Sequence, residues 1–319
     1  MHFKRLFAIA LCAGAALAAA PALAQNVTKI VVPFNAGGAT DSYVRLIAAE
    51  MSKLGVQTIV ENKPGGSGLI AAGYVARSAP DGLTLFMGSN STMANNVVLF
   101  QKMPYDPFKD FAPVSHIGYQ PSLLIARANA PFSSLKEMVA YAKANPDRIN
   151  RASVGAGNIT NLAGVIVDRT AGIRTTHVPY TGDTVAVQGL LSDQVDTYVG
   201  SLTLALPLHQ AGKLRVLGVF DHKRLEQLPD VPTFKESGWD IEVNAWYCLV
   251  APAATPPETI TRLNRLVNQI LESKEFAERA KALGVERRGG SPQDLGRFIR
   301  AEYDRWAPIL TELGLAKSL

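Results

Sequence analysis

The chain has 319 residues, of which 32 are lysine or arginine, 27 are aspartate or glutamate and 47% are hydrophobic. This length is sufficient for two domains that each bury a core of their own. The basic residues are scattered and form no stripe interleaved with aromatic residues, so a nucleic-acid-binding surface is not expected. The small excess of positive charge favours anionic ligands.

The N-terminus has the three parts of a secretory signal peptide. Lys4 and Arg5 precede an apolar stretch over residues 6–17, and an Ala-Leu-Ala sequence ends at Ala24. This order of charged, apolar and small residues predicts a signal peptide over residues 1–24 and export to the periplasm. Cleavage leaves 30 basic and 27 acidic residues. No later segment is apolar enough to predict a membrane span.

The two cysteines differ in their expected roles. A lipoprotein anchor at Cys12 is an alternative to cleavage after Ala24, but Leu11 stands where a small residue would be needed. After cleavage only Cys248 remains, so no internal disulfide can form. It lies in an apolar run over residues 246–250, which favours a buried, inert thiol over a nucleophile.

The first third of the mature chain alternates strand and helix patterns. Short β-rich runs at 29–32, 57–61 and 83–88 each end in a turn of small residues. An amphipathic helix pattern over 43–54 follows the first turn, and a helix through Tyr74 and Val75 follows the second. This alternation predicts a parallel sheet with helices on its faces.

The same pattern starts again near residue 122 and returns to the first sheet at the end of the chain. A helix is expected over 134–144, and strands are expected at 122–126, 151–154, 175–178, 195–199, 214–220 and 245–251. We therefore predict two α/β lobes. Residues 25–121 and 222–319 form the first, and residues 122–221 form the second as an insertion.

Two helices of the C-terminal part have predicted N-caps. Thr255 precedes a helix with two prolines in its first turn, and Ser291 precedes one with proline at its first position. Pro308 should bend the second of these helices near its end.

The absence of catalytic motifs argues against an enzyme. The sequence has no His-Glu-x-x-His helix, no cysteine pair for zinc and no Gly-x-Ser-x-Gly elbow, because Leu69 replaces the last glycine. The turn at 155–160 lacks the third glycine of a dinucleotide fingerprint and the lysine of a phosphate loop. The remaining histidines, at 116, 177, 209 and 222, are widely spaced. No catalytic residue, metal or cofactor is expected.

Three turns of small residues are candidates for an anion site. They lie at 34–40, 89–92 and 155–160, each after a strand and before a helix. Such turns expose backbone N–H groups at the positive end of a helix dipole, where a carboxylate can bind without arginine. Glycine can also serve only to permit a tight turn, but three turns of the same polarity favour binding.

Three side chains near these turns need separate interpretation. Asp41 would repel an anionic ligand, so we expect it to cap the helix that begins there. Thr40 is the better candidate for ligand contact. Tyr180 follows another strand and could offer its hydroxyl to the pocket, although a place in the core is equally compatible with the sequence.

Several segments of the chain resemble the tripartite tricarboxylate transporter receptors, also called Bug proteins. The matching segments are 31–41 (Val-Val-Pro-Phe-Asn-Ala-Gly-Gly-Ala-Thr-Asp), 61–68 (Glu-Asn-Lys-Pro-Gly-Gly-Ser-Gly), 79–82 (Ala-Pro-Asp-Gly), 104–107 (Pro-Tyr-Asp-Pro), 178–180 (Val-Pro-Tyr) and 228–233 (Leu-Pro-Asp-Val-Pro-Thr). They occur in the family's order and span nearly the whole mature chain.

The resemblance implies a type II periplasmic-binding-protein fold, in which two lobes joined by two crossings close around a carboxylate or dicarboxylate. It also implies that the loops at 34–40 and 153–160 hold the two ends of the ligand, and that the turn at 89–91 and the Tyr180 segment complete the cleft. The ligand-binding residues expected on these grounds are Phe34, Asn35, Ala36, Gly37, Thr40, Ser89, Asn90, Ser91, Gly155, Gly157, Asn158, Thr160, Tyr180, Gly182 and Ser201.

The chain departs from the family pattern at three places. Thr181 stands where members often have lysine, and Asn161 stands where many have histidine. An acidic or amide residue is common in the family near 200–202, where this chain has Gly-Ser-Leu. These differences leave the ligand open.

The resemblance implies a monomeric receptor that delivers its ligand to the two membrane subunits of a permease. One alternative is a sensor that presents the ligand to a histidine kinase, which neighbouring genes would reveal. The other is a periplasmic hydrolase, which would need a nucleophile beside a base, and the sequence offers no local pair of this kind.

Overall fold

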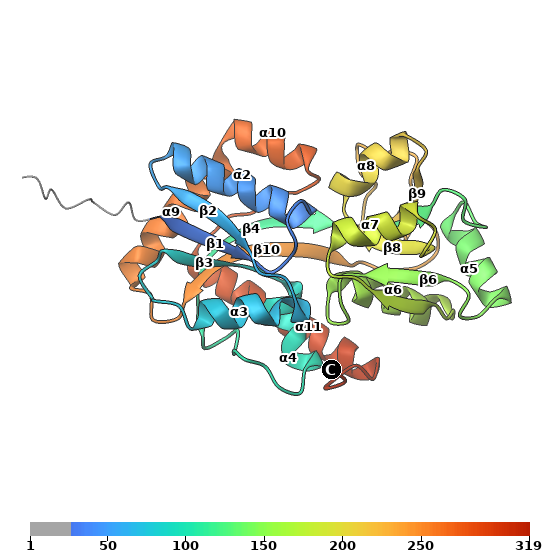
Figure 1. The fold of residues 1–319 in the computed structure, drawn as a ribbon, viewed down its shortest axis with the longest axis horizontal. Coiled ribbons are helices and arrows are strands. Elements are labelled where there is room, and N and C mark those ends of the chain that lie inside the picture. Colours follow the sequence, from blue (N-terminus) through green and yellow to red (C-terminus); the bar gives the residue numbers. More distant parts are fainter. Residues whose placement is uncertain (1–26) are drawn as a thin grey trace, which may run out of the picture.

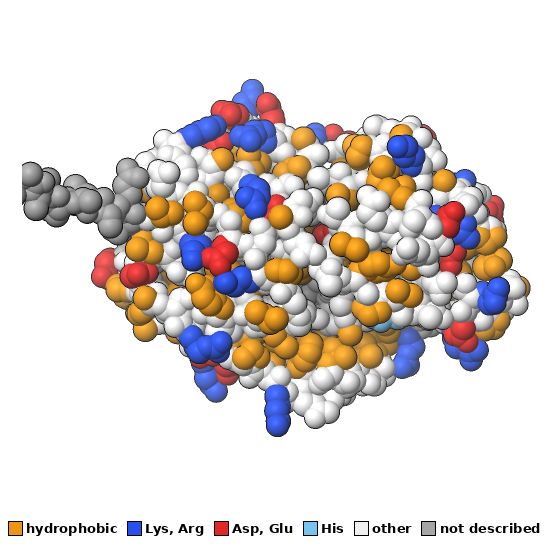
Figure 2. Space-filling model, in the orientation of Figure 1, with side chains coloured by type: hydrophobic (Ala, Val, Ile, Leu, Met, Phe, Trp, Pro, Cys, Tyr) orange, Lys and Arg blue, Asp and Glu red, His pale blue; other side chains and the backbone are white. Residues whose placement is uncertain are grey.

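The computed structural model describes residues 27–319, which form two five-stranded sheets flanked by helices (Figure 1). Residues 1–26, with the expected signal peptide and Cys12, lie outside the described residues. Within residues 27–319, no helix is both long and apolar enough to cross a membrane. Lysine and arginine side chains are spread over the face shown in Figure 2 and do not form one patch.

The first sheet has the strand order β2-β1-β3-β10-β4, with β10 antiparallel to its neighbours and the other four strands aligned. Its strands are β1 (Thr28–Val32), β2 (Thr58–Asn62), β3 (Thr84–Ser89), β4 (Phe111–Pro121) and β10 (Asn244–Pro252). Its helices are α2 (Ala39–Lys53), η1 (Gly66–Gly68), α3 (Leu69–Ala76), η2 (Ser91–Asn95), α4 (Asn96–Leu99), α9 (Pro257–Glu272), α10 (Lys274–Ala282) and α11 (Pro292–Glu312).

Helices cover both faces of the first sheet, which explains why residues 30–32 of β1 are all apolar. Ile30 and Val32 pack with α2, α9 and α10, whereas Val31 packs with α3, η2 and α11 on the other face. Successive side chains of a strand point to opposite faces, so the part of a strand that is covered on both sides is apolar at every position.

The second sheet has the strand order β7-β6-β8-β5-β9, with β5 antiparallel to its neighbours. Its strands are β5 (Leu123–Arg127), β6 (Asn150–Ser153), β7 (Thr176–Pro179), β8 (Thr197–Gly200) and β9 (Leu214–Val219). Its helices are α5 (Leu135–Ala144), α6 (Ile159–Ala171), α7 (Asp183–Leu191) and α8 (Leu202–Gln210). Helices α5 and α6 pack on one face and α7 and α8 on the other.

The two sheets repeat one arrangement. In each, the second strand in the order, β1 or β6, lies between two parallel neighbours, and the one reversed strand lies next to the opposite edge. The reversed strands follow the crossings between the sheets. The chain crosses directly from Pro121 to Leu123 and returns over residues 220–243. The two lobes and two crossings expected from the resemblance are therefore present.

The C-terminal helix α11 contacts both lobes. Leu295 and Ile299, near its start, pack in the core of the first lobe. Trp306 and Leu310, near its end, belong to a buried cluster that extends into the core of the second lobe. Arg169 of α6 also donates a hydrogen bond to the carbonyl oxygen of Leu313 (2.9 Å). Helix α11 is thus a third connection between the lobes, made by packing.

Most predicted elements occur within one or two residues of the expected positions, but β4 was not predicted. Of the two predicted caps, Ser291 is confirmed. It forms a capping box with Asp294 at the start of α11. Thr255 is not a cap, because α9 begins at Pro257 after Pro256 and the Thr255 hydroxyl donates to the carbonyl of Pro252 (2.7 Å). Pro308 lies inside α11, which continues to Glu312.

Cys248 is fully buried on β10, as expected. Burial raises the pKa of its thiol far above the ordinary value, and the backbone at Gly88 offsets this only in part. A thiol with a raised pKa is a poor nucleophile.

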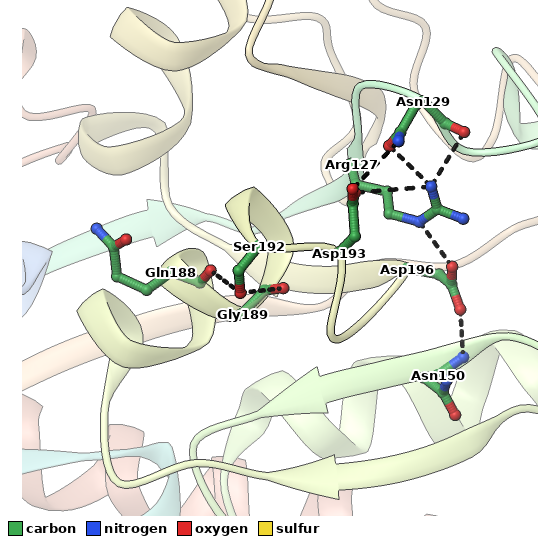
Figure 3. A network of polar contacts seen from close by, with 8 residues as sticks. All are labelled: Arg127, Asn129, Asn150, Gln188, Gly189, Ser192, Asp193 and Asp196. Atoms are coloured by element: carbon green, nitrogen blue, oxygen red, sulfur yellow. Dashed lines mark hydrogen bonds and ion pairs between the residues drawn. The ribbon is translucent and has the colours of Figure 1, made fainter.

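A polar network ties three strands of the second lobe together (Figure 3). The Asp196 carboxylate accepts hydrogen bonds from Arg127 Nε and from the Asn150 backbone N–H, both at 2.8 Å. Arg127 also donates through Nη1 to Asn129 and lies 3.7 Å from Asp193. Because both Arg127 and Asp196 are largely buried, this network contributes more than a solvent-exposed ion pair would.

We expect Asp196→Asn to lower the free energy of unfolding by about 2 kcal/mol, since it removes a charge from hydrogen bonds that join β5, β6 and β8. The matched control is Asp147→Asn, because Asp147 pairs with Arg174 at the surface (2.8 Å). This variant should lose less than about 1 kcal/mol of its free energy of unfolding. Urea unfolding of the two variants measures the difference. Equal losses would show that the network adds nothing beyond a surface pair.

Candidate functional site

A cavity of about 50 Å³ lies between the two sheets, and residues from both lobes line it. It is built at the carboxyl ends of β1, β3, β6 and β8 and by the crossing strands. The lining residues are Phe34, Thr40, Ser89, Asn90, Ser91, Gln120, Pro121, Ser122, Val154, Asn158, Ile159, Thr160, Asp183, Val199, Gly200, Ser201, Ala245 and Tyr247. Space of this size holds only a few water-sized groups, so the lobes are close together.

The first loop, between β1 and α2, is shaped by Asp41. Its Oδ2 accepts hydrogen bonds from the Gly37 N–H and Arg45 Nε, both at 2.9 Å, and its Oδ1 accepts one from Asn62 Nδ2 at 2.8 Å. Burial opposes ionisation of Asp41, but hydrogen bonds from Arg45, Gly37 and Asn62 outweigh it and lower the pKa. The N-cap of α2 is Gly38, so the predicted capping role of Asp41 is wrong. Asp41 holds the loop in place from within the first turn.

The second turn follows β3. The Ser89 N–H donates to Thr92 Oγ1 (3.0 Å), and Asn90 bonds to β10 through the Asn244 carbonyl and the Trp246 N–H. These bonds fix the turn against the reversed strand. The Ser89 hydroxyl oxygen is buried and has no hydrogen-bond partner within residues 27–319.

The loop of the second lobe, between β6 and α6, has its own supports. Asn158 caps α6 by accepting from the Thr160 N–H (3.0 Å), and Thr160 Oγ1 accepts from the Val154 N–H (3.0 Å). Ser153 Oγ bonds to the Gly155 N–H (3.2 Å) and to His177 Nε2 (2.6 Å). The loop is therefore held at both ends before any ligand binds.

Ser201 follows β8 and is the N-cap of α8. Its hydroxyl, like that of Ser89, has no partner in the described part of the chain. Ser89 ends β3 and Ser201 follows β8, which are corresponding strands of the two sheets, so each lobe contributes one unpartnered hydroxyl to the described cavity wall. Tyr247 on β10 is paired with Ser89 in the sheet, also lines the cavity, and donates to Gln120 Oε1 (2.8 Å).

Asp183 is the one carboxylate among the described lining residues, and it was not predicted. It begins α7, and its Oδ1 accepts a hydrogen bond from the Tyr198 hydroxyl. No lysine, arginine or histidine is among the described residues that line the cavity. Desolvation raises the Asp183 pKa, and the bond from Tyr198 opposes this only in part. The sequence signal that could have identified Asp183 as a cavity residue is its position directly after Gly182 of the Tyr-x-Gly turn.

Eight of the fifteen predicted residues line the cavity, namely Phe34, Thr40, Ser89, Asn90, Ser91, Asn158, Thr160 and Ser201. The structure does not bring the other seven to the cavity wall: Asn35, Ala36, Gly37, Gly155, Gly157, Tyr180 and Gly182. Tyr180 instead packs against the core of the second lobe, where a Cβ on Gly189 would lie 2.5 Å from its hydroxyl. Ala36 and Gly37 are exposed on the first loop.

Four of these seven lie where the two lobes meet. Asn35 Nδ2 donates to the carbonyl oxygen of Thr181 (3.2 Å), next to Gly182. A Cβ on Gly155 would lie 3.1 Å from Ser67 Oγ, and one on Gly157 would lie 3.0 Å from Asn96 Oδ1. A larger side chain at Gly155, Gly157 or Gly182 would therefore meet atoms of the first lobe.

These features define the class of protein: two lobes of the same topology with a cavity between them, lined by apolar side chains and a few polar groups, as in solute-binding proteins. The model of the tripartite tricarboxylate transporter family receptor matches residues 43–315. The chain belongs to this family, and the resemblance inferred from its motifs is confirmed. Within residues 27–319, no cluster of three histidine, cysteine or acidic residues could hold a metal ion.

Three solved structures are similar over nearly the whole chain. R. palustris Rpa4515, solved with adipate, is 35% identical with a TM-score of 0.88, covering 91% of this chain and 97% of that one. MatC (Rpa3494) from Rhodopseudomonas palustris, with bound malate, is 35% identical with a TM-score of 0.84, covering 89% and 98%. The periplasmic binding protein BugD is 32% identical with a TM-score of 0.87, covering 91% and 98%.

His177 makes the second lobe sensitive to acid. Burial lowers its pKa to about 4, and the nearby Arg151 charge acts in the same direction. The unfolded side chain titrates near its ordinary value of about 6.5. Between about pH 6.5 and pH 4 the unfolded state therefore binds a proton that the folded state does not, so stability falls as the pH falls.

We expect His177→Gln to reduce the loss of stability between pH 7 and pH 5, because glutamine can bond to Ser153 but does not titrate. The slope contributed by one such group is at most about 1.4 kcal/mol per pH unit. Urea unfolding at pH 7, 6 and 5 measures it for both proteins. Parallel losses in the variant and the unmodified protein would contradict this assignment.

Proposed function

We propose that this protein captures a small organic carboxylate between its lobes in the periplasm and delivers it to a tripartite tricarboxylate transporter. Its role is to bind and release, without chemistry on the ligand. The signal peptide over residues 1–24 would direct export. The folded receptor would then meet the two membrane subunits of the permease as a monomer, through surfaces of both lobes near the mouth of the cleft.

The observation that carries this proposal is the pair of unpartnered hydroxyls, Ser89 and Ser201, on opposite walls of the cavity. Buried polar groups normally have a hydrogen-bond partner, so two that share a cavity indicate a missing polar ligand. Both can donate to carboxylate oxygens. Bonds to a charged acceptor are stronger than neutral ones, and here they would form away from water.

Backbone groups support the same ligand class. Helices α2 and α8 begin at the cavity, and neither has a described side chain bonded to its first N–H groups. The unpaired N–H groups and the helix dipole favour a negative charge at this end. A carboxylate could therefore be held from the first lobe by α2 and from the second by α8, without a basic side chain.

The similar proteins support a carboxylate ligand. Rpa4515 was solved with adipate and MatC with malate, and both share the fold of this chain over about nine-tenths of its length. These two acids differ in length and in hydroxyl content. This family of folds therefore accepts different carbon skeletons, and the apolar lining residues of this chain, such as Phe34 and Val199, would select among them.

We expect thermal unfolding to shift upward with at least one acid from a panel of mono-, di- and tricarboxylates, because a ligand that binds only the folded state stabilises it. At a concentration of 100 Kd the gain is about 2.7 kcal/mol. Ser89→Ala and Ser201→Ala should each weaken the affinity about ten- to a hundredfold, as expected for one hydrogen bond to a charged group. Titration calorimetry measures these affinities.

The control for both variants is Ser192→Ala, which removes an exposed hydroxyl at the end of α7, away from the cavity. Its affinity should equal that of the unmodified protein. A panel in which no acid raises the melting temperature would contradict the proposed function. Losses as large in Ser192→Ala as in the other two would contradict the role of the hydroxyls.

We also expect Gly157→Asp to weaken binding at least tenfold while the protein remains folded. The new side chain would meet Asn96 and Leu99 of the first lobe and hold the cleft open. Small-angle X-ray scattering with saturating ligand should show a larger radius of gyration than for the unmodified protein. A variant that closes normally would show that this contact does not control closure.

A further inference from the structure

Asp183 is an acidic group placed where a receptor for a simple anion would not be expected to have one. It lines the cavity with Phe34, Thr40 and Ser201, and it keeps part of its surface open toward that space. Only its Oδ1 has a hydrogen-bond partner among the described residues, the Tyr198 hydroxyl. Its Oδ2 is directed at the first lobe, 3.1 Å from the position of a Cβ on Gly38.

No positive side chain of the described residues neutralises Asp183. The ionisable groups that act on it are the hydroxyls of Tyr198 on β8 and Tyr247 on β10, and neither carries positive charge. Desolvation without a cation raises the pKa of its carboxyl. A second carboxylate bound beside an ionised Asp183 would be repelled, and the repulsion is strong where water is excluded.

A positive group on the ligand would remove this conflict. Gly38, which Asp183 approaches, is the N-cap of α2, so a site for a carboxylate and a site for a cation lie side by side. An amino acid has its ammonium and carboxylate on the same carbon. It could place the carboxylate at the start of α2 and the ammonium on Asp183 at once.

From this juxtaposition we propose that the ligand is an amino-acid-like zwitterion and that Asp183 binds its ammonium group. This inference rests on the proposed function, since it names the class of carboxylate that the same cavity takes. Asp183 would then be the residue that distinguishes amino acids from plain acids of the same skeleton. The Tyr198 hydroxyl would orient the carboxylate by holding its other oxygen.

The test compares ligands that differ only in the ammonium group: aspartate with succinate, glutamate with glutarate, and alanine with propionate. In titrations of the unmodified protein at pH 7, we expect the amino acid of at least one pair to bind at least tenfold more tightly than its plain partner. This comparison needs no variant. Plain acids that bind as tightly as their amino partners in every pair would overturn the inference and leave the proposed function intact.

Asp183→Asn tests the residue itself. Its affinity for the preferred amino acid should fall at least tenfold, and its affinity for the plain partner should stay equal or rise, because repulsion is removed. The control is Asp193→Asn, a surface change in the same lobe, which should alter neither affinity. Should Asp183→Asn bind both members of the pair as the unmodified protein does, Asp183 has no such role.

A third result would point to a different chemistry. If the plain acids bind more tightly than the amino acids, and Asp183→Asn weakens them, then Asp183 acts as a protonated hydrogen-bond donor to a carboxylate, and the ammonium proposal is wrong. If no acid of either kind binds the unmodified protein, the proposed function itself fails. The outcomes for the two proposals can thus be told apart.

Discussion

The geometry of the site depends on one constraint: two sheets of the same strand order face each other with the carboxyl ends of corresponding strands. Strands β1 and β6 lead to helices α2 and α6, and β3 and β8 lead to the Ser89 and Ser201 turns. In an open α/β sheet, this edge is where unpaired N–H groups collect. Both lobes direct this edge of their sheets toward the same cavity. The cavity therefore has hydrogen-bond donors in its wall, although none of its described lining residues has a basic side chain.

A cavity wall of this kind, made of backbone N–H groups and hydroxyls, separates two roles that one arginine would combine: holding a carboxylate and selecting among ligands. Backbone groups and serine hydroxyls are held by the fold, so their position depends on residues that never reach the cavity, such as Asp41 in the first lobe and Ser153 in the second. The one carboxylate of this wall among the described residues is Asp183, two residues after Thr181, where the family resemblance implies a lysine.

The sequence predicted the sheets, the helices and the turns well, because apolar β-rich runs followed by small polar residues recur along it. It did not predict β4, whose eleven residues include two prolines and alternate weakly, and which forms a strand because β10 pairs along its length. The sequence also could not separate residues that line the cavity from residues that form the contact between the two lobes. Gly157 and Asn158 are neighbours in one turn, yet the first faces Asn96 of the other lobe and the second faces the cavity. That difference arises only when the lobes meet.

The packing of α11 against both lobes has a mechanical consequence for this receptor. Two chain crossings alone would act as a plain hinge, but a helix seated on both sides must shift, bend or lose contacts whenever the angle between the lobes changes. Pro308 has no N–H to donate to the carbonyl oxygen of Asp304, so one backbone hydrogen bond of α11 is missing at the end that packs against the second lobe. A change in the angle between the lobes would therefore involve side chains near the C-terminus that do not line the cavity, such as Trp306 and Leu310. Substitutions there would be expected to affect opening and release of a ligand without changing the residues that contact it.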